Sequence, residues 1–501
     1  MEWVSVSRRL CAALSLLGSL LGGCDPTVAD TGSRATEAAS GRLNVLLITV
    51  DDMNWDSLGV TGVRLRGISP NIDRLAREGI LFKQAHVTVA TCYPSRNVWM
   101  TGRYPQNHGA LGFEDIGADV PTLVEALAAA GYYTGLMAKR MHVVPSRVAA
   151  WNQVLVSKDL KGGRSPQLYF EHAREFFERA KAAGKPFFLM GNSLDPHRPF
   201  AASDQEARAN HGSSGGRYPE AKLAYLPSEI PVPRFLPDLP EIRRELAEYY
   251  TSVRRADETT GALLRALDES GLADRTVVMW LSDNGISLPF AKANVWLNST
   301  RTPWIVRWPH VVTPGRIDDR HFVSGVDLAP TILDAAGLQN LNGADGRSFV
   351  PLLRGESQTG RDRVFTQIDE VHSGASYPMR AVTDGSYGYI FNAWADGKTE
   401  FRIESMAGRT FAAMQKAAVT DPAIASRVRH FVYRTREELY DYRSDPDALH
   451  NLIDDPRYRD VATKYRQILR RHLKEAADPE LSAFDRWMAE RRSPARVAQP
   501  D

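Results

Sequence analysis

The stretch Asn44-Val-Leu-Leu-Ile-Thr-Val50, which runs directly into Asp51 and Asp52, decides the fold of this chain. Its nearly continuous apolar and β-branched character indicates a strand buried on both faces, as in a parallel sheet covered by helices. Helical patterns alternate with further apolar runs, which lie at Tyr133–Ala138, Pro186–Leu194, Thr276–Ser282 and Trp304–Trp308. The alternation predicts an α/β fold with a large, mostly parallel sheet sandwiched by helices.

The pattern changes after Arg354, where shorter and more polar strands precede a helical stretch at Val461–Ala476. We therefore expect a large N-terminal domain over residues 42–359 and a smaller C-terminal α+β subdomain over residues 360–501. The 501 residues are enough to bury a sizeable core.

Composition excludes some partners. The chain has 62 basic and 60 acidic residues, a formal net charge of +2. Such a balance provides no long-range attraction for nucleic acid or for an anionic membrane, so recognition of an anion has to be local.

The N-terminus has the pattern of an export signal. Arg8 and Arg9 precede an apolar run from Leu10 to Leu21, which is too short to span a bilayer. The run ends next to Cys24, which predicts a lipoprotein-type signal peptide over residues 1–24 with Cys24 lipidated; a plain secretory signal is the alternative. Residues 25–41 then form a flexible tether. We expect an exported protein, periplasmic or at the surface of a bacterial envelope, with this lipid as its only membrane anchor.

Oxygen-bearing side chains follow two of the predicted strands. Asp51 and Asp52 come after the first, and Asp283 and Asn284 come after Thr276–Ser282. Since open parallel sheets bind ligands at the carboxyl ends of their strands, the two pairs are expected to meet there. Clustered carboxylates are costly unless a hard cation neutralises them, and all-oxygen ligation favours calcium or, less so, magnesium. A helix cap and an ordinary turn are the alternatives.

Cys92 is the only cysteine available to the body of the protein, because Cys11 and Cys24 lie in the leader. A lone cysteine is usually a small buried hydrophobe and sometimes a reactive thiol. Here it opens the string Cys92-Tyr93-Pro94-Ser95-Arg96, which Thr101-Gly102-Arg103 follows.

These motifs resemble the type I sulfatases. The Cys92–Arg96 string, Asp195-Pro196-His197, Ser282–Gly285 and Glu438–Asp441 occur in the order found in that family, and Ser376–Arg380 is similar to its sulfamidase branch. The resemblance implies an alkaline-phosphatase-like fold and hydrolysis of sulfate esters or sulfamates of saccharides. It also implies that a maturation enzyme oxidises Cys92 to formylglycine, whose hydrate attacks sulfur.

The resemblance assigns roles residue by residue. Calcium would be held by Asp51, Asp52, Asp283, Asn284 and modified Cys92. Catalytic roles fall to Arg96, which fixes this geometry, to His142 as base, to His197 as proton donor, and to Lys292 as a sulfate-binding cation. Substrate-binding roles fall to Lys139, Arg140, Asp195, Glu370 and Arg380.

One segment departs from the family pattern. The family has Gly-Lys-x-His where this chain has Ala138-Lys139-Arg140-Met141-His142, so either Lys139 or Arg140 contacts the sulfate. An interdomain ion pair is the alternative for Glu370 and Arg380. A loop histidine that caps backbone carbonyls is the alternative for His197, and a solvated loop lysine is the alternative for Lys292.

Two other functions remain open at this point. The first is a phosphate or phosphonate ester hydrolase of the same fold, although few histidines lie near the aspartate pairs. The second is a glycan-binding lipoprotein without turnover, which the altered Lys139–His142 spacing would allow.

Overall fold

The computed structural model describes residues 41–211 and 217–492. The predicted signal peptide, Cys24 and the tether up to residue 40 lie outside the described residues. Within the described ranges, no helix is both long enough and apolar enough to cross a membrane.

A large sheet forms the centre of the molecule, with strand order β5-β4-β6-β1-β7-β8-β2-β9. β1 pairs in parallel with β6 on one side and with β7 on the other, and only β8 runs antiparallel to its neighbours. The strands are β1 (Asn44–Val50), β2 (Ile80–Phe82), β4 (Tyr133–Met137), β5 (Gln153–Leu155), β6 (Phe187–Asn192), β7 (Thr276–Ser282), β8 (Trp304–Arg307) and β9 (Arg316–Asp318). The predicted mostly parallel sheet is confirmed.

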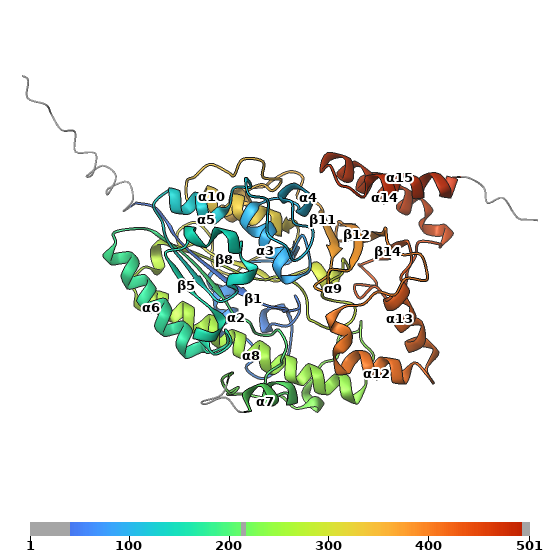
Figure 1. Ribbon diagram of the computed structural model, residues 1–501, viewed down its shortest axis with the longest axis horizontal. Coiled ribbons are helices and arrows are strands. Elements are labelled where there is room, and N and C mark those ends of the chain that lie inside the picture. The colour runs from blue at the N-terminus through green and yellow to red at the C-terminus, as the bar shows by residue number, and fades with distance from the viewer. Residues whose placement is uncertain (1–40, 212–216, 493–501) are drawn as a thin grey trace, which may run out of the picture.

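Helices cover both faces of this sheet (Figure 1). One face carries α2 (Pro70–Glu78), α6 (Pro166–Ala182) and α8 (Pro240–Glu269), and the other carries α3 (Cys92–Thr101), α5 (Leu123–Ala129) and α10 (Leu328–Ala335). Alternate residues of β1 point to opposite sides: Leu46 and Ile48 belong to the first core, Val45 and Leu47 to the second. This explains why the strand has no polar face to show in the sequence.

The C-terminal part builds a separate antiparallel sheet, β11 (Val364–Glu370), β12 (Ser376–Thr383), β13 (Tyr387–Asn392) and β14 (Glu437–Asp441). Four helices accompany it: α12 (Arg409–Ala417), α13 (Pro422–Tyr433), α14 (Arg459–Glu475) and α15 (Leu481–Arg492). The predicted α+β architecture is confirmed here, while the boundary at residue 360 remains a prediction.

A buried carboxylate connects the two parts. Glu245 of α8 pairs with Arg198 at 2.5 Å and accepts backbone hydrogen bonds from Arg409 at 3.2 Å and Thr410 at 2.7 Å, at the start of α12. Burial alone would raise the pKa of Glu245, but Arg198 and these donors lower it, so the group is ionised. Arg198 directly follows His197, so this contact links the C-terminal subdomain to a predicted site residue.

Replacing Glu245 by alanine should therefore destabilise the protein. It leaves the partly buried Arg198 and two backbone N–H groups without their acceptor, which should lower the free energy of unfolding by about 2–4 kcal/mol. Urea denaturation followed by tryptophan fluorescence measures this. Glu241→Ala, on the exposed first turn of the same helix, is the control and should change stability by less than about 0.5 kcal/mol. Equal stability of both variants would contradict the bridging role.

Candidate active site

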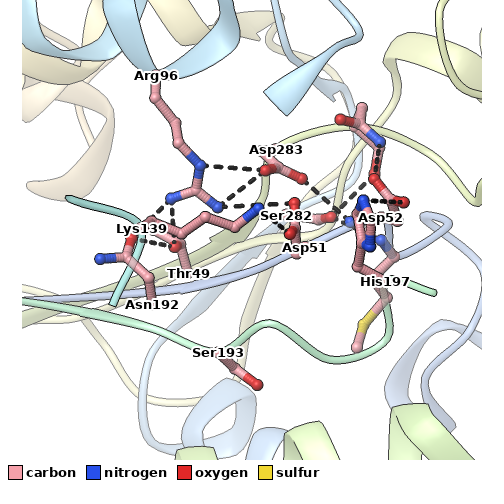
Figure 2. A network of polar contacts seen from close by, with 12 residues as sticks. Thr49, Asp51, Asp52, Arg96, Lys139, Asn192, Ser193, His197, Ser282 and Asp283 are labelled. Carbon is pink, nitrogen blue, oxygen red and sulfur yellow. Dashed lines mark hydrogen bonds and ion pairs between the residues drawn. The ribbon is translucent and has the colours of Figure 1, made fainter. Parts of the chain in front are cut away.

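Two parallel strand ends bring the acidic residues together. Because β1 and β7 pair in register, with Val50 opposite Ser282, the residues that follow each strand are neighbours. The backbone N–H of Asp52 donates to Asp283 Oδ1 at 3.1 Å, and Asn284 Nδ2 donates to Asp52 Oδ1 at 2.7 Å. All four predicted oxygen ligands therefore lie in one buried cluster, part of which Figure 2 shows.

The backbone turns sharply at this cluster. Asp52 has a φ of 64°, in the left-handed region that residues with a Cβ seldom adopt. Ser282 supports the turn, since its Oγ accepts from the backbone N–H of Met53 and donates to the carbonyl of Asn284, both at 2.9 Å. Strain of this kind persists only where surrounding contacts hold it, which is common at functional sites.

The N-terminus of α3 brings Cys92 to the acidic cluster. Cys92 is the first residue of the helix and only 4% exposed, and every residue of this helix is buried. One ligand atom each from Asp51, Cys92 and Asp283 lie within 4.8 Å of one another, and the same holds for Asp52, Cys92 and His197. Burial raises the pKa of the Cys92 thiol, so the unmodified side chain is neutral and a weak nucleophile.

Arg96 lies one helical turn after Cys92 and is fully buried. Its Nε and Nη2 donate to Asp283 Oδ2 at 3.1 and 2.8 Å, and its Nη1 donates to Asn192 Oδ1 at 2.6 Å and to Thr49 Oγ1 at 3.0 Å. Figure 2 shows the guanidinium held between these groups. Arg96 therefore fixes the orientation of Asp283.

Lys139 and Arg140 have different environments in the structure. Ala138 and Lys139 both have positive φ, 60° and 55°, and the turn directs Lys139 inward, where its ammonium pairs with Asp51. Arg140 points away from the cluster and contacts the sulfur of the exposed Met141. Lys139 is thus the cation of this segment that can reach a substrate anion; the structure does not support the predicted role of Arg140 in substrate binding.

His142 lies beside Lys139 at the edge of the cluster. Its ring stacks on Tyr93, with centroids 5.6 Å apart and planes 8° from parallel. Burial, with Lys139 adding to it, lowers the pKa of His142 to about 3, and its Nδ1 is buried without a hydrogen-bond partner. The ring is therefore neutral near neutral pH, and its Nδ1 is free to accept a hydrogen bond.

His197 and Lys292 approach from the opposite side. His197 Nδ1 lies 2.6 Å from the Arg198 carbonyl, which can only accept, so Nδ1 carries the proton and Nε2 faces Asp52 Oδ2 at 3.7 Å. Lys292 is 2% exposed and pairs with Asp52 at 2.9 Å and with Glu404. Both side chains therefore border the cluster, as the sequence predicted.

The backbone carbonyl of Asp195 accepts a hydrogen bond from the N–H of Asp51 at 3.2 Å, but the Asp195 side chain is directed to other partners. Its carboxylate is buried between Arg164, at 2.7 Å, and Arg255, at 2.6 Å. Arg164 also donates to the carbonyls of His197 and Pro199. Asp195 therefore supports the loop that carries His197, and its predicted role as a substrate ligand is corrected.

The two residues predicted from the C-terminal subdomain also lie elsewhere. Arg380 is 2% exposed and pairs at 2.6 Å with both Asp369 and Asp478, all inside the subdomain. It is neither a sugar ligand nor part of an interdomain pair. Glu370 packs against Gly112 and does not line the cavity beside Lys292. Neither residue is retained as a substrate ligand.

The residues of the cluster fit a hard divalent cation. Asp51 Oδ1 and Asn284 Oδ1 are buried without a hydrogen-bond donor, an arrangement that costs free energy unless something else binds them, whereas Asp51 Oδ2 pairs with the ammonium of Lys139. Burial raises the pKa of Asp283, and contact with Asp51 raises it further, because two adjacent carboxylates are costly to ionise together. A cation between them removes that cost, and an all-oxygen set suits calcium or magnesium.

A cavity of about 500 Å³ opens beside the cluster. Thr91, Phe113 and Lys292 line it from the N-terminal domain, and Val371, Tyr377 and Glu404 line it from the C-terminal subdomain. Sequence reasoning missed Glu404, for which no local signal exists. It also missed Asn192, although this residue ends a strand parallel to β1 and the same strand-end argument would have found it.

Comparison with known proteins identifies the family. The model described as "Sulfatase" matches residues 43–338, and the one described as "N-sulphoglucosamine sulphohydrolase, C-terminal" matches residues 288–394. The chain belongs to the sulfatase family. It is 31% identical to the N-sulphoglucosamine sulphohydrolase of Homo sapiens over 486 residues, which cover 90% of this chain and 94% of the human one. The resemblance predicted from the motifs is confirmed, and with it the enzyme class, a sulfuric ester hydrolase.

A further relative and two solved structures share lower sequence identity with the chain. An "Ulvan-active sulfatase" of Formosa agariphila is 25% identical over 89% of this chain and 77% of its own length. A sulfatase structure solved with its substrate D-glucosamine-2-N,6-O-disulfate superposes with a TM-score of 0.65 at 19% identity, covering 88% of this chain and 99% of the other. A phosphonate monoester hydrolase of Agrobacterium radiobacter gives a TM-score of 0.62 at 20% identity, covering 87% and 96%. Likeness at these identities shows the shared alkaline-phosphatase-like fold.

The structural role of Arg380 can be tested directly. Arg380→Ala leaves Asp369 and Asp478 buried without their common partner, so we expect a loss of about 3–5 kcal/mol in the free energy of unfolding. Urea denaturation gives that loss, with Arg402→Ala as the control, because Arg402 is 78% exposed in its pair with Glu400. Unchanged stability together with a raised KM for a sulfated sugar would instead restore Arg380 as a substrate ligand.

Proposed function

We propose that this sulfatase is exported and hydrolyses sulfate esters or sulfamates of saccharides, using formylglycine made from Cys92 and a calcium ion. The observation that carries the proposal is the packing of the Cys92 sulfur against Asp51 and Asp283, whose neighbour Asn284 keeps an unpaired oxygen. A nucleophile at this position adjoins the proposed cation and the side chains of Lys139 and Lys292.

The balance of charges in the cluster supports the binding of an anionic sulfate group next to the proposed cation. Each of the three carboxylates has a cationic side chain beside it: Asp51 has Lys139, Asp52 has Lys292, which also pairs with Glu404, and Asp283 has Arg96. Added divalent charge therefore leaves the site positive as a whole. An anionic sulfate group is then attracted to a place where protein cations can stabilise the charge of the transition state.

Each residue around the cluster has a separate role in the proposed reaction. Formylglycine supplies, when hydrated, an attacking hydroxyl and a second hydroxyl that expels the sulfate, while calcium, held by Asp51, Asp52, Asp283 and Asn284, offsets negative charge. His142 accepts a proton through its neutral ring. His197, when its Nε2 carries a proton, gives that proton to the leaving oxygen or nitrogen, and this Nε2 lies 3.7 Å from Asp52 Oδ2. Lys139 and Lys292 hold the sulfate oxygens.

The substrate class follows from the relatives. The human relative is named for N-sulphoglucosamine, and the structure in complex contains a sulfated glucosamine. Other relatives are ulvan-active, so algal polysaccharide is a second source of sulfated sugar. We propose a sulfated saccharide of the glycosaminoglycan type as substrate.

The proposed route to the envelope rests on the first 24 residues. Arg8, Arg9 and the apolar run favour export, and Cys24 favours a lipid anchor at the periplasmic or outer surface. A formylglycine-generating enzyme is then a required partner, because the proposed nucleophile derives from Cys92.

Cys92→Ala tests the nucleophile. Protein coexpressed with a formylglycine-generating enzyme should release sulfate from a panel of sulfated sugars, and the variant should lose at least about 10³-fold in kcat/KM, since the proposed chemistry begins at this atom. Peptide mass spectrometry confirms conversion in the wild type, and circular dichroism confirms that the variant folds. Matched phosphate and phosphonate esters in the same panel test the alternative function, hydrolysis of phosphate or phosphonate esters. Undiminished sulfate release by the variant would overturn the mechanism.

Asp283→Asn tests the cation. The substitution keeps the shape of the side chain but removes a charge, so we expect calcium affinity to fall by at least about tenfold and activity to fall with it. Calorimetric titration of calcium into protein from which a chelator has removed the metal measures the calcium affinity independently of turnover. Asp268→Asn, whose side chain is 42% exposed on α8, is the control and should bind calcium like the wild type. Full affinity in Asp283→Asn would remove it from the ligand set.

A further inference from the structure

The cavity beside the acidic cluster is mainly apolar away from its inner end. Phe113, Val371, Tyr377 and Ile403 line it, and the ring of Phe113 meets His372 edge to face, with centroids 4.9 Å apart. Its volume of about 500 Å³ is in the range of small-ligand pockets, roughly 300–1,000 Å³. Apolar and aromatic walls of this kind contact the faces of a sugar ring but do not distinguish one ring substituent from another.

Glu404 provides the one carboxylate among the residues that line this cavity, whereas Lys292 at its inner end and the largely exposed Arg402 provide positive charge. It opens the short helix Glu404–Ala407, and its side chain is 37% exposed. Its Oε1 pairs with Lys292 and accepts from Ser287 Oγ at 3.4 Å, while Oε2 has no hydrogen-bond donor among the described residues. One oxygen is therefore anchored to the site and the other is available to a ligand.

Neighbouring side chains stabilise the ionised form of Glu404. Burial alone would raise the pKa of Glu404, but Lys292 and, to a lesser degree, His197 lower it below its ordinary value. The group is ionised at neutral pH and can only accept hydrogen bonds. A hydroxyl or N–H of a ligand at this place is stabilised, and a carboxylate or a second sulfate is repelled.

The position relative to the sulfate site defines which substituent Glu404 meets. Lys292 lies 2.9 Å from Asp52 and also contacts Glu404, so one side chain separates the acidic cluster from this carboxylate. A sugar whose sulfate is held by Lys292 therefore has the substituents of the neighbouring ring carbon next to Glu404.

We propose that Glu404 determines substrate specificity by accepting a hydrogen bond from a hydroxyl beside the sulfated position of an amino sugar, and by excluding sugars with an anionic group there. This inference rests on the proposed function, because it requires a sulfated saccharide in the cavity. It predicts discrimination between sugars that differ only in one added sulfate.

The test compares Glu404→Gln with the wild type, both matured with a formylglycine-generating enzyme. The probes are N-sulfoglucosamine, its analogue with a second sulfate on O3, and 4-nitrophenyl sulfate, which has no sugar ring. The wild type should prefer N-sulfoglucosamine over the O3-sulfated analogue by at least about tenfold in kcat/KM. The variant should narrow that preference to about threefold or less. It should also lose at least about tenfold more on N-sulfoglucosamine than on 4-nitrophenyl sulfate, mainly through a raised KM.

Glu356→Gln is the control. Glu356 is exposed and lies outside the lining of the cavity, so all three rates should match the wild type. The Glu400 position is unsuitable because its partner Arg402 lines the cavity. Calorimetry measures how tightly the two sugars bind when no turnover takes place. The comparison is between Cys92→Ala and the double variant Cys92→Ala/Glu404→Gln.

Three outcomes would overturn the inference. The first is an unchanged preference in Glu404→Gln, and the second is an equal loss on all three probes, which would mean that Glu404 acts only by positioning Lys292. The third is hydrolysis of 4-nitrophenyl sulfate without hydrolysis of N-sulfoglucosamine by the wild type. Failure of the wild type on every sulfate probe would instead reject the proposed function itself, so the two failures are distinguishable.

Discussion

The parallel pairing of β1 with β7 is the constraint on which the rest of the site depends. It fixes Val50 opposite Ser282 and so forces Asp51, Asp52 and Asp283 into a space that water does not reach. Such crowding of like charge is unfavourable in a protein interior and requires compensation from other segments. Arg96, Lys139 and Lys292 provide it from three separate loops and helices. The sheet therefore brings buried negative charges together, and the surrounding elements supply the positive charges that balance them.

A second set of buried ion pairs holds those elements in position. Asp195, between Arg164 and Arg255, braces the loop that carries His197, and Glu245 ties the same loop to the start of α12. Buried pairs of this kind add little net stability compared with apolar packing, but removing one partner is costly. Their value here is geometric, because they restrict His197 and Glu404 to one arrangement around the cavity.

The sequence predicted the parts of the site that regular structure determines. Asp51, Asp52, Asp283 and Asn284 follow buried strands, so local pattern was sufficient to place these four together, whereas Cys92 and Arg96 were singled out by the resemblance of their motif to a known family. Local pattern was insufficient for Lys139 and Arg140, since the choice between them depends on two residues with positive φ that propensity does not reveal. Asp195 and Arg380 were misassigned because their partners are distant in sequence. Glu404 was missed for a related reason. It is far from Lys292 in the sequence and lies in an irregular segment, so only the tertiary fold brings the two side chains into contact.

The complete burial of α3 has a consequence for the order of events in biosynthesis. A modifying enzyme has to reach the Cys92 side chain, yet in the folded chain every residue of this helix is covered by the core. Under the proposed chemistry, oxidation must therefore precede the closure of the domain, and the two processes compete for the newly made polypeptide. A chain that folds too early is trapped as a stable but inert thiol, so the yield of active enzyme depends on folding speed as much as on the quantity of the oxidising partner.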